Sequence, residues 1–166
     1  GRPGPGGPSA APTSPAATPT VLPVRSVQDF DPPPGDGQEN PRDVGKAVDG
    51  DPATAWLTQQ YYGRPDLGGL KKGVGLLLDL GSPQRVRQVD VTLVGQGTDL
   101  QLRTADSGGA SADDFAVAAT VTGAGTQAQL RPAQPVTARY LLLWLTRLPA
   151  DGTFFRGGIA EVRVLG

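Results

Sequence analysis

The sequence predicts an all-β fold, either a sandwich or a barrel, and we favour a two-sheet antiparallel sandwich of about eight strands. Short segments rich in Val, Leu and Thr recur along the chain. Turn residues separate them, since the 166 residues include 24 Gly and 17 Pro. The segments between strands are too short and too Gly-rich for the crossover helices of a parallel sheet, which favours antiparallel pairing.

The first third of the chain predicts one edge strand and one short helix. Residues 21–30 form an interrupted strand, and Pro23, which has no N–H to donate, places it at the edge of a sheet. Residues 41–48 predict one or two helical turns, with Asn40 as the N-cap.

The later strands follow from apolar runs and from alternation. Residues 74–80 are almost continuously apolar and predict a buried strand, and residues 137–145 are apolar on both faces and predict a central one. Alternation predicts half-buried strands at three further places: 89–94, 99–104 and 159–165. Residues 115–121 and 126–130 predict a hairpin around a Gly-rich turn.

Several function classes are excluded by what the chain lacks. Without His or Cys there is no Ser-His-Asp triad, no Cys nucleophile and no zinc finger. A glycosidase is the least favoured alternative, because no motif pairs two carboxylates as that reaction requires. The net charge of −1 gives no electrostatic attraction for nucleic acid. We therefore expect a non-catalytic, monomeric domain that binds no nucleic acid and does not itself insert into a membrane.

A change in composition divides the chain at residue 21. Residues 1–20 contain six Pro and no large apolar side chain, so they cannot bury enough apolar surface to offset the entropy of ordering. We expect this segment to be a disordered or extended Pro/Ala/Gly-rich linker, and residues 21–166 to be one domain of a longer protein.

Four segments, in order, resemble the discoidin or coagulation-factor type C family. They are residues 47–56 (AVDGDPATAW), 78–81 (LDLG), 138–141 (ARYL) and 159–166 (IAEVRVLG). The resemblance covers residues 21–166 and implies a galactose-binding-like jelly roll.

Two stretches, 73–80 and 139–146, are similar to the extracytoplasmic C-terminal domain of actinobacterial membrane proteins that carry a protein-kinase-like region, some fused to a lipid II flippase of the MviN/MurJ type. This likeness implies a place on the outer face of the plasma membrane, in a larger protein anchored upstream. We expect a binding or sensing module for a cell-wall glycan, such as peptidoglycan, or for an envelope protein. The alternative is a structural protein–protein interaction domain with no small-molecule ligand.

Residues 49–54 allow two interpretations. Asp49, Asp51 and Thr54 place two carboxylates and a hydroxyl beside a glycine, and such oxygens either surround a hard cation or only stabilise a turn. The resemblance implies a structural Ca²⁺ or Na⁺ here. It assigns six ligands: the Lys46 carbonyl, Asp49, Asp51, Thr54, the Ala160 carbonyl and Glu161. An acid such as Glu161 in an otherwise apolar strand needs a partner.

Two pairs of aromatic residues lie in Gly-rich stretches and predict a ligand surface made by loops. The predicted binding residues are Tyr61, Tyr62, Arg64, Phe154 and Phe155. The alternative is that one ring of each pair lies in the core. We also expect Trp56 and Trp144 in the core, Lys71 and Lys72 in a solvated loop, and Asp113 and Asp114 in a helical turn or cap.

Overall fold

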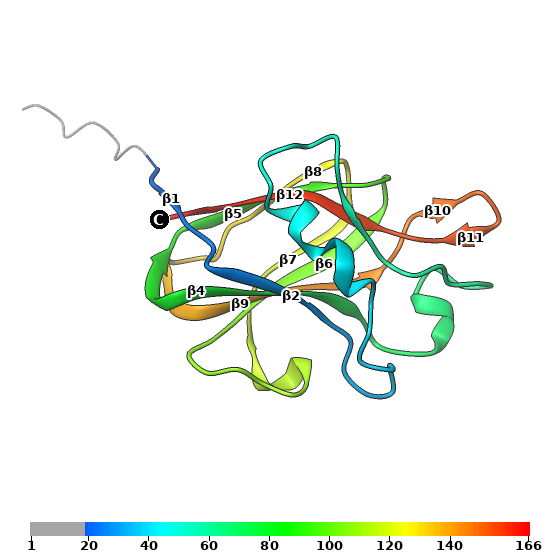
Figure 1. Cartoon of the computed structure of the whole chain (residues 1–166), viewed down its shortest axis with the longest axis horizontal. Coiled ribbons are helices and arrows are strands. Elements are labelled where there is room, and N and C mark those ends of the chain that lie inside the picture. Colours follow the sequence, from blue (N-terminus) through cyan, green and yellow to red (C-terminus); the bar gives the residue numbers. More distant parts are fainter. Residues whose placement is uncertain (1–18) are drawn as a thin grey trace, which may run out of the picture.

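Two five-stranded sheets pack face to face in the computed structural model, which describes residues 19–166 (Figure 1). Sheet I contains β1 (Val21–Leu22), β12 (Gly158–Leu165), β5 (Gln88–Leu93) and β8 (Gln127–Leu130) in spatial order, with β3 (Trp56–Leu57) also paired to β12. Sheet II contains β2 (Ser26–Phe30), β4 (Val74–Val86), β9 (Val136–Arg147), β6 (Thr98–Ala105) and β7 (Ala116–Ala124). All of these pairings are antiparallel, which confirms the predicted sandwich.

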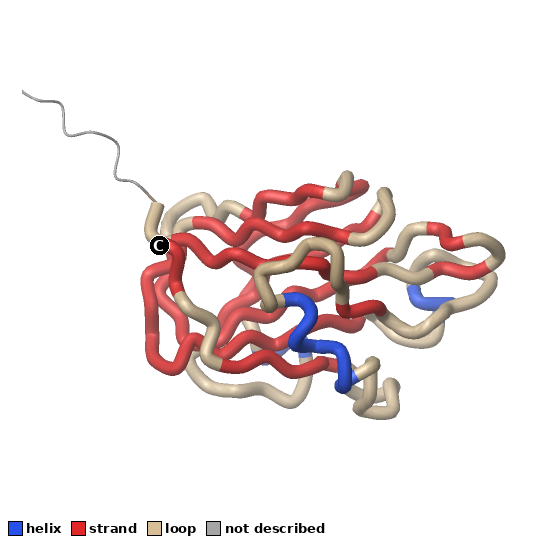
Figure 2. Tube along the Cα trace, turned by 45° about the horizontal axis from the view of Figure 1, so that its top comes forward, coloured by secondary structure: helices blue, strands red, loops and turns tan. Residues whose placement is uncertain are grey.

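Short elements complete the structure. Within residues 19–166 three of these are 3₁₀ helices: η2 (Pro41–Ala47), η3 (Leu67–Gly69) and η4 (Ala112–Asp114). The hairpin of β10 (Ala150–Asp151) and β11 (Phe154–Phe155) stands apart from both sheets. Figures 1 and 2 both place this hairpin and η3 at the end of the sandwich away from the C-terminus. No helix within residues 19–166 is long and apolar enough to cross a membrane.

Strand β9 lies at the centre of sheet II, between β4 and β6, as its two apolar faces predict. On one face its leucines, such as Leu143, are fully buried between the sheets. On the other face Trp144 packs edge-to-face against Phe30, with ring centroids 5.9 Å apart, in a second apolar cluster that also contains Phe115. The predicted core positions of Trp56 and Trp144 are confirmed.

The predicted hairpin of residues 115–130 is wrong. Strand β7 pairs with β6 in sheet II, whereas β8 pairs with β5 in sheet I, so the chain crosses between the sheets after Ala124. Ala124 and Ala128 are buried in the core on either side of this crossing. A Gly-rich turn suits such a corner as well as it suits a hairpin. The predicted strand 21–30 is likewise divided, because β1 and β2 lie at the edges of different sheets.

Asn40 is the N-cap residue of η2, as predicted, but its side chain makes no capping hydrogen bond; its amide Nδ2 donates to the Leu57 carbonyl at 2.7 Å instead. The start of the domain differs from the one expected. Most of the predicted linker, residues 1–18, lies outside the described residues. Thr20 exchanges backbone hydrogen bonds of 3.1 and 2.8 Å with Gly166, so regular pairing begins one residue before the predicted domain start.

Candidate functional site

Two loops that are distant in sequence meet at the end of the sandwich. Tyr61 and Phe155 form an isolated antiparallel bridge, in which the N–H of Tyr61 donates at 2.8 Å and the N–H of Phe155 donates back at 2.7 Å. Next to this bridge, the rings of Tyr62 and Phe154 lie edge-to-face with centroids 6.1 Å apart. The structure therefore brings together the two loops that carry the predicted aromatic residues.

The four aromatic rings have different environments. Tyr61 is buried, with 5% of its surface exposed, and Phe155 is half-buried against the core. Tyr62 is 64% exposed, and Phe154 is half-buried beside it. One ring of each pair thus belongs to the core, and Tyr61 is not on the surface. We call the remaining pair, Tyr62 and Phe154, the aromatic ledge.

The arginines beside the aromatic ledge are already paired with acids. Arg64 donates to both carboxylate oxygens of Asp66, at 2.9 and 2.6 Å, and this guanidinium lowers the pKa of Asp66. Arg156 lies 5.4 Å from the centroid of the Phe154 ring and donates to Asp151 at 3.0 and 2.7 Å. A ligand carboxylate at the aromatic ledge would have to compete with these aspartates.

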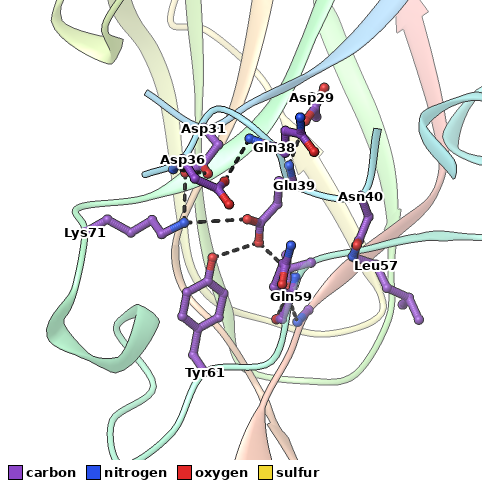
Figure 3. A network of polar contacts seen from close by, with 12 residues as sticks. Asp29, Asp31, Asp36, Gln38, Glu39, Asn40, Leu57, Gln59, Tyr61 and Lys71 are labelled. Atoms are coloured by element: carbon purple, nitrogen blue, oxygen red, sulfur yellow. Dashed lines mark hydrogen bonds and ion pairs between the residues drawn. The ribbon is translucent and has the colours of Figure 1, made fainter. Parts of the chain in front are cut away.

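A buried polar network supports the loop that carries Tyr62 (Figure 3). The carboxylate of Glu39 accepts hydrogen bonds from the Tyr61 hydroxyl and from the Gln59 N–H, both at 2.8 Å. Lys71 Nζ lies 2.8 Å from Asp31 and 3.6 Å from Glu39. The network therefore links three segments: the stretch after β2, the loop after β3 and the loop before β4.

Two groups of the network, Glu39 and Tyr61, have raised pKa values. Glu39 is fully buried, and this burial raises the pKa of its carboxyl group despite the hydrogen bonds and the nearby Lys71 charge. Burial and the Glu39 charge raise the pKa of Tyr61. The side chain of Lys71 is only 12% exposed, so the prediction that Lys71 lies in a solvated loop is wrong.

The predicted cation loop lies against the last strand. The N–H of Gly50 donates to Glu161 Oε1 at 2.9 Å, which joins residues far apart in sequence as expected. Asp49 accepts from the Thr54 hydroxyl and from the Asp51 N–H. Partial burial, followed by the charges of Asp49 and Asp51, raises the pKa of Glu161.

The contacts of the 49–54 loop can be compared with its two interpretations, a cation site and a simple turn. The hydrogen bonds of Asp49 and Thr54 are those of a turn, and no group of three or more acidic side chains within residues 19–166 is arranged to hold a metal ion. A cation here would therefore depend on the carbonyls of Lys46 and Ala160 as well as on carboxylates. The oxygen-only donor set suits a hard cation, and the site stays a prediction.

A groove of about 780 Å³ opens on the outer face of sheet II. Its floor is formed by β6 and β9 side chains, namely Gln101, Arg103, Trp144 and Thr146. Its walls are the turn 32–34, the loop 64–73 and the segment 111–113. The last segment is the expected helical turn, since η4 includes Asp113 and Asp114, and Asp114 accepts the N–H groups of Ala110 and Ser111.

No protein-family model matches the chain. Its structure is similar to the CBM32 of AlyQ in complex with 4,5-unsaturated mannuronic acid, at a TM-score of 0.62 and 15% identity over 87% of this chain and 97% of that one. The chain has a galactose-binding-like β-sandwich fold. A chitosan-binding module from a Paenibacillus sp. IK-5 chitosanase/glucanase is also similar, with a TM-score of 0.61 and 19% identity over 88% of this chain and 98% of that one.

A third structure shares the galactose-binding-like sandwich as part of a larger enzyme. It is a Ruminococcus gnavus GH29 fucosidase in complex with fucose, with a TM-score of 0.59 and 19% identity over 84% of this chain. This chain spans only 24% of the fucosidase.

Sequence reasoning missed the polar network and the groove. Asp31, Glu39 and Lys71 are separated along the chain and stand among ordinary loop residues, so no spacing links them. One signal was available, since Glu39 and Asn40 precede the motif that ends in Trp56, whose indole N–H donates to the Glu39 carbonyl at 2.8 Å. The groove could not be predicted because Arg103 and Trp144 come together on one face of sheet II only through the pairing of β6 with β9.

Proposed function

We propose that this chain is a non-catalytic glycan-binding module and that the aromatic ledge is its binding surface. The observation that carries the proposal is the backbone bridge between Tyr61 and Phe155, which presents Tyr62 and Phe154 side by side on a rigid support. Aromatic faces bind the apolar faces of sugar rings. The likeness to carbohydrate-binding modules supports this choice.

The surroundings of the aromatic ledge suit a sugar better than a purely apolar ligand. The Tyr62 hydroxyl donates to Gln60 at 3.0 Å, and Arg156, which is paired with Asp151, lies 5.4 Å from the centroid of the Phe154 ring. Such groups offer both donors and acceptors to sugar hydroxyls, which both donate and accept.

We propose further that the module is extracytoplasmic and that its ligand is a cell-wall glycan, with peptidoglycan as the first candidate. The support is the resemblance of residues 73–80 and 139–146 to the external domains of membrane-anchored kinase-like proteins. A structural Ca²⁺ or Na⁺ at the 49–54 loop belongs to the same proposal, supported by the Gly50–Glu161 contact.

A protein partner is the second candidate. Leu70 lies on the same loop as Tyr62 and is 70% exposed. Two large exposed apolar side chains on one loop are also found at protein interfaces. The experiment below separates the two partners.

The test is a binding assay on insoluble glycans, with peptidoglycan, chitosan and alginate as matrices. We expect retention on at least one matrix, and loss of retention in Tyr62→Ala. Val117→Ala is the matched control, because Val117 is also an exposed apolar residue, at 52%, but lies on β7. Binding to no glycan, or equal retention of Tyr62→Ala and the wild type, would overturn the aromatic ledge and favour the protein partner.

A further inference from the structure

We propose that the groove on the outer face of sheet II is a second binding site, and that it takes a sugar carrying a carboxylate, bound by Arg103. Neither ring of the aromatic ledge lines the groove, although the Arg64–Asp66 pair on the loop after Tyr62 does. Its volume of about 780 Å³ lies in the range of ordinary ligand pockets. This inference depends on the proposed function only in taking the ligand to be a saccharide.

Arg103 is held in a fixed orientation. Its Nε donates to Gln101 at 2.8 Å, and its Nη1 donates to the Ala112 carbonyl at 2.8 Å. The guanidinium lies 6.0 Å from the centroid of the Trp144 ring. Within residues 19–166 its other terminal nitrogen, Nη2, has no acceptor and is not a buried atom. A pre-oriented guanidinium with one unused nitrogen is suited to an anionic oxygen.

Nearby acids do not fully neutralise the positive charges of Arg103 and Lys72 in the groove. Of the four cations that line it, Arg64 is paired with Asp66, and Lys71 is paired with the buried Asp31. Lys72 is exposed and makes no ion pair within the described residues. The remaining acid, Asp113, is 93% exposed and lies 3.7 Å from Arg103 Nη1, where solvent screens its charge.

The apolar part of the groove fits a sugar ring. The turn 32–34 consists of three prolines and forms one wall, where Pro33 and Pro34 are exposed; Trp144 lies beneath the floor and is only 4% exposed. The C–H face of a pyranose packs against such surfaces, while Gln101 and Thr146 offer polar contacts to hydroxyls. A free phosphate or a small carboxylate would satisfy Arg103 but would leave these surfaces unused.

The experiment measures binding of uronate trisaccharides (glucuronate, galacturonate and mannuronate) to the full chain by calorimetry. We expect at least one to bind with a dissociation constant below about 1 mM. Its methyl ester, which keeps the shape and loses the charge, should bind about 10-fold more weakly or worse. Arg103→Gln should reduce affinity for the acid by about 10-fold and leave affinity for the ester unchanged. Lys72→Ala, an exposed change that does not threaten folding, should reduce affinity by a smaller factor that shrinks as salt rises.

Tyr62→Ala separates this proposal from the proposed function. It should leave uronate binding in the groove intact while abolishing retention on chitosan, a matrix without carboxylates that only the aromatic ledge would bind. The groove proposal is overturned if no uronate binds at 10 mM, if acid and ester bind equally, or if neither Arg103→Gln nor Lys72→Ala weakens binding. It is also overturned if inorganic phosphate or acetate binds as tightly as the trisaccharide, because the site would then recognise a simple anion.

Discussion

Tyr61 and Phe155 each donate a backbone N–H to the carbonyl of the other, at 2.8 and 2.7 Å. This pair joins the loop after β3 to the β10–β11 hairpin without using any side chain. The positions of the neighbouring rings, Tyr62 and Phe154, are therefore fixed by the backbone. Side chains on the aromatic ledge can be changed without separating the two loops, which makes binding and folding experimentally separable.

The two adjacent tyrosines should differ in their effect on stability. Tyr61→Phe removes a buried hydroxyl that donates to Glu39, and we expect the free energy of unfolding to fall by about 1–2 kcal/mol. Tyr62→Phe removes an exposed hydroxyl and should change stability by less than about 0.5 kcal/mol. Urea denaturation of both variants measures the contrast. Equal stabilities would show that the Tyr61–Glu39 contact does not support the loop.

Glu39 should make the protein lose stability as the pH rises. Burial raises the pKa of Glu39 above 4.5, so the folded protein holds this proton more tightly than the unfolded chain. The resulting stabilisation is fully present below pH 4.5 and is lost as the pH rises through the raised pKa. Glu39→Gln keeps an acceptor for Tyr61 but cannot titrate.

The measurement for Glu39 is the difference in unfolding free energy between Glu39→Gln and the wild type. The stability of Glu39→Gln relative to the wild type should increase as the pH rises from 4.5 towards neutral. The comparison removes the contribution of Glu161, whose pKa is also raised, because that group is present in both proteins. A difference that is constant with pH, or that moves the other way, would contradict the predicted direction.

Calcium should stabilise the protein if the 49–54 loop binds it. At a free Ca²⁺ concentration 100-fold above the dissociation constant, the gain is about 2.7 kcal/mol, visible as a rise in melting temperature. Asp49→Ala should abolish this rise. Asp113→Ala is the control, since Asp113 is a highly exposed acid remote from the loop in sequence. If neither Ca²⁺ nor Na⁺ raises the melting temperature of the wild type, the loop is only a turn.

Gly75 should tolerate no side chain. A Cβ at this position would lie 1.7 Å from the Leu143 carbonyl oxygen, at the point where β4 pairs with β9. We expect Gly75→Ala to lower the free energy of unfolding by about 4 kcal/mol or to prevent folding. At Gly125 nothing lies within 4 Å of such a Cβ, so Gly125→Ala should cost less than about 0.5 kcal/mol. Similar denaturation midpoints for the two variants would contradict this account of the β4–β9 pairing.

Strand positions could be predicted because burial imposes a pattern on local sequence. The apolar run at 74–80 and the two-faced strand at 137–145 both became long central strands, β4 and β9. Strand partners could not be read in the same way. The local sequence of residues 126–130 does not distinguish pairing with β5 from pairing with β7. Which partner the strand takes depends on how the two sheets pack together.

The candidate site was predictable only in part. Paired aromatic residues in Gly-rich loops identified the two segments that meet at Tyr61 and Phe155. Which ring faces solvent depends on Glu39, which holds the Tyr61 hydroxyl in the interior. That partner lies in another loop, and its role emerges only from the folded arrangement of the three segments.

The most direct test of glycan binding at the aromatic ledge is an NMR titration that follows the ring signals of Tyr62 and Phe154. Soluble peptidoglycan fragments, chitosan oligomers and alginate oligomers are the titrants. The account predicts saturable shifts of both rings with at least one titrant, and none for the buried Trp56. Absence of any ring shift at 10 mM of every titrant, or saturable shifts confined to residues away from Tyr62 and Phe154, would contradict it.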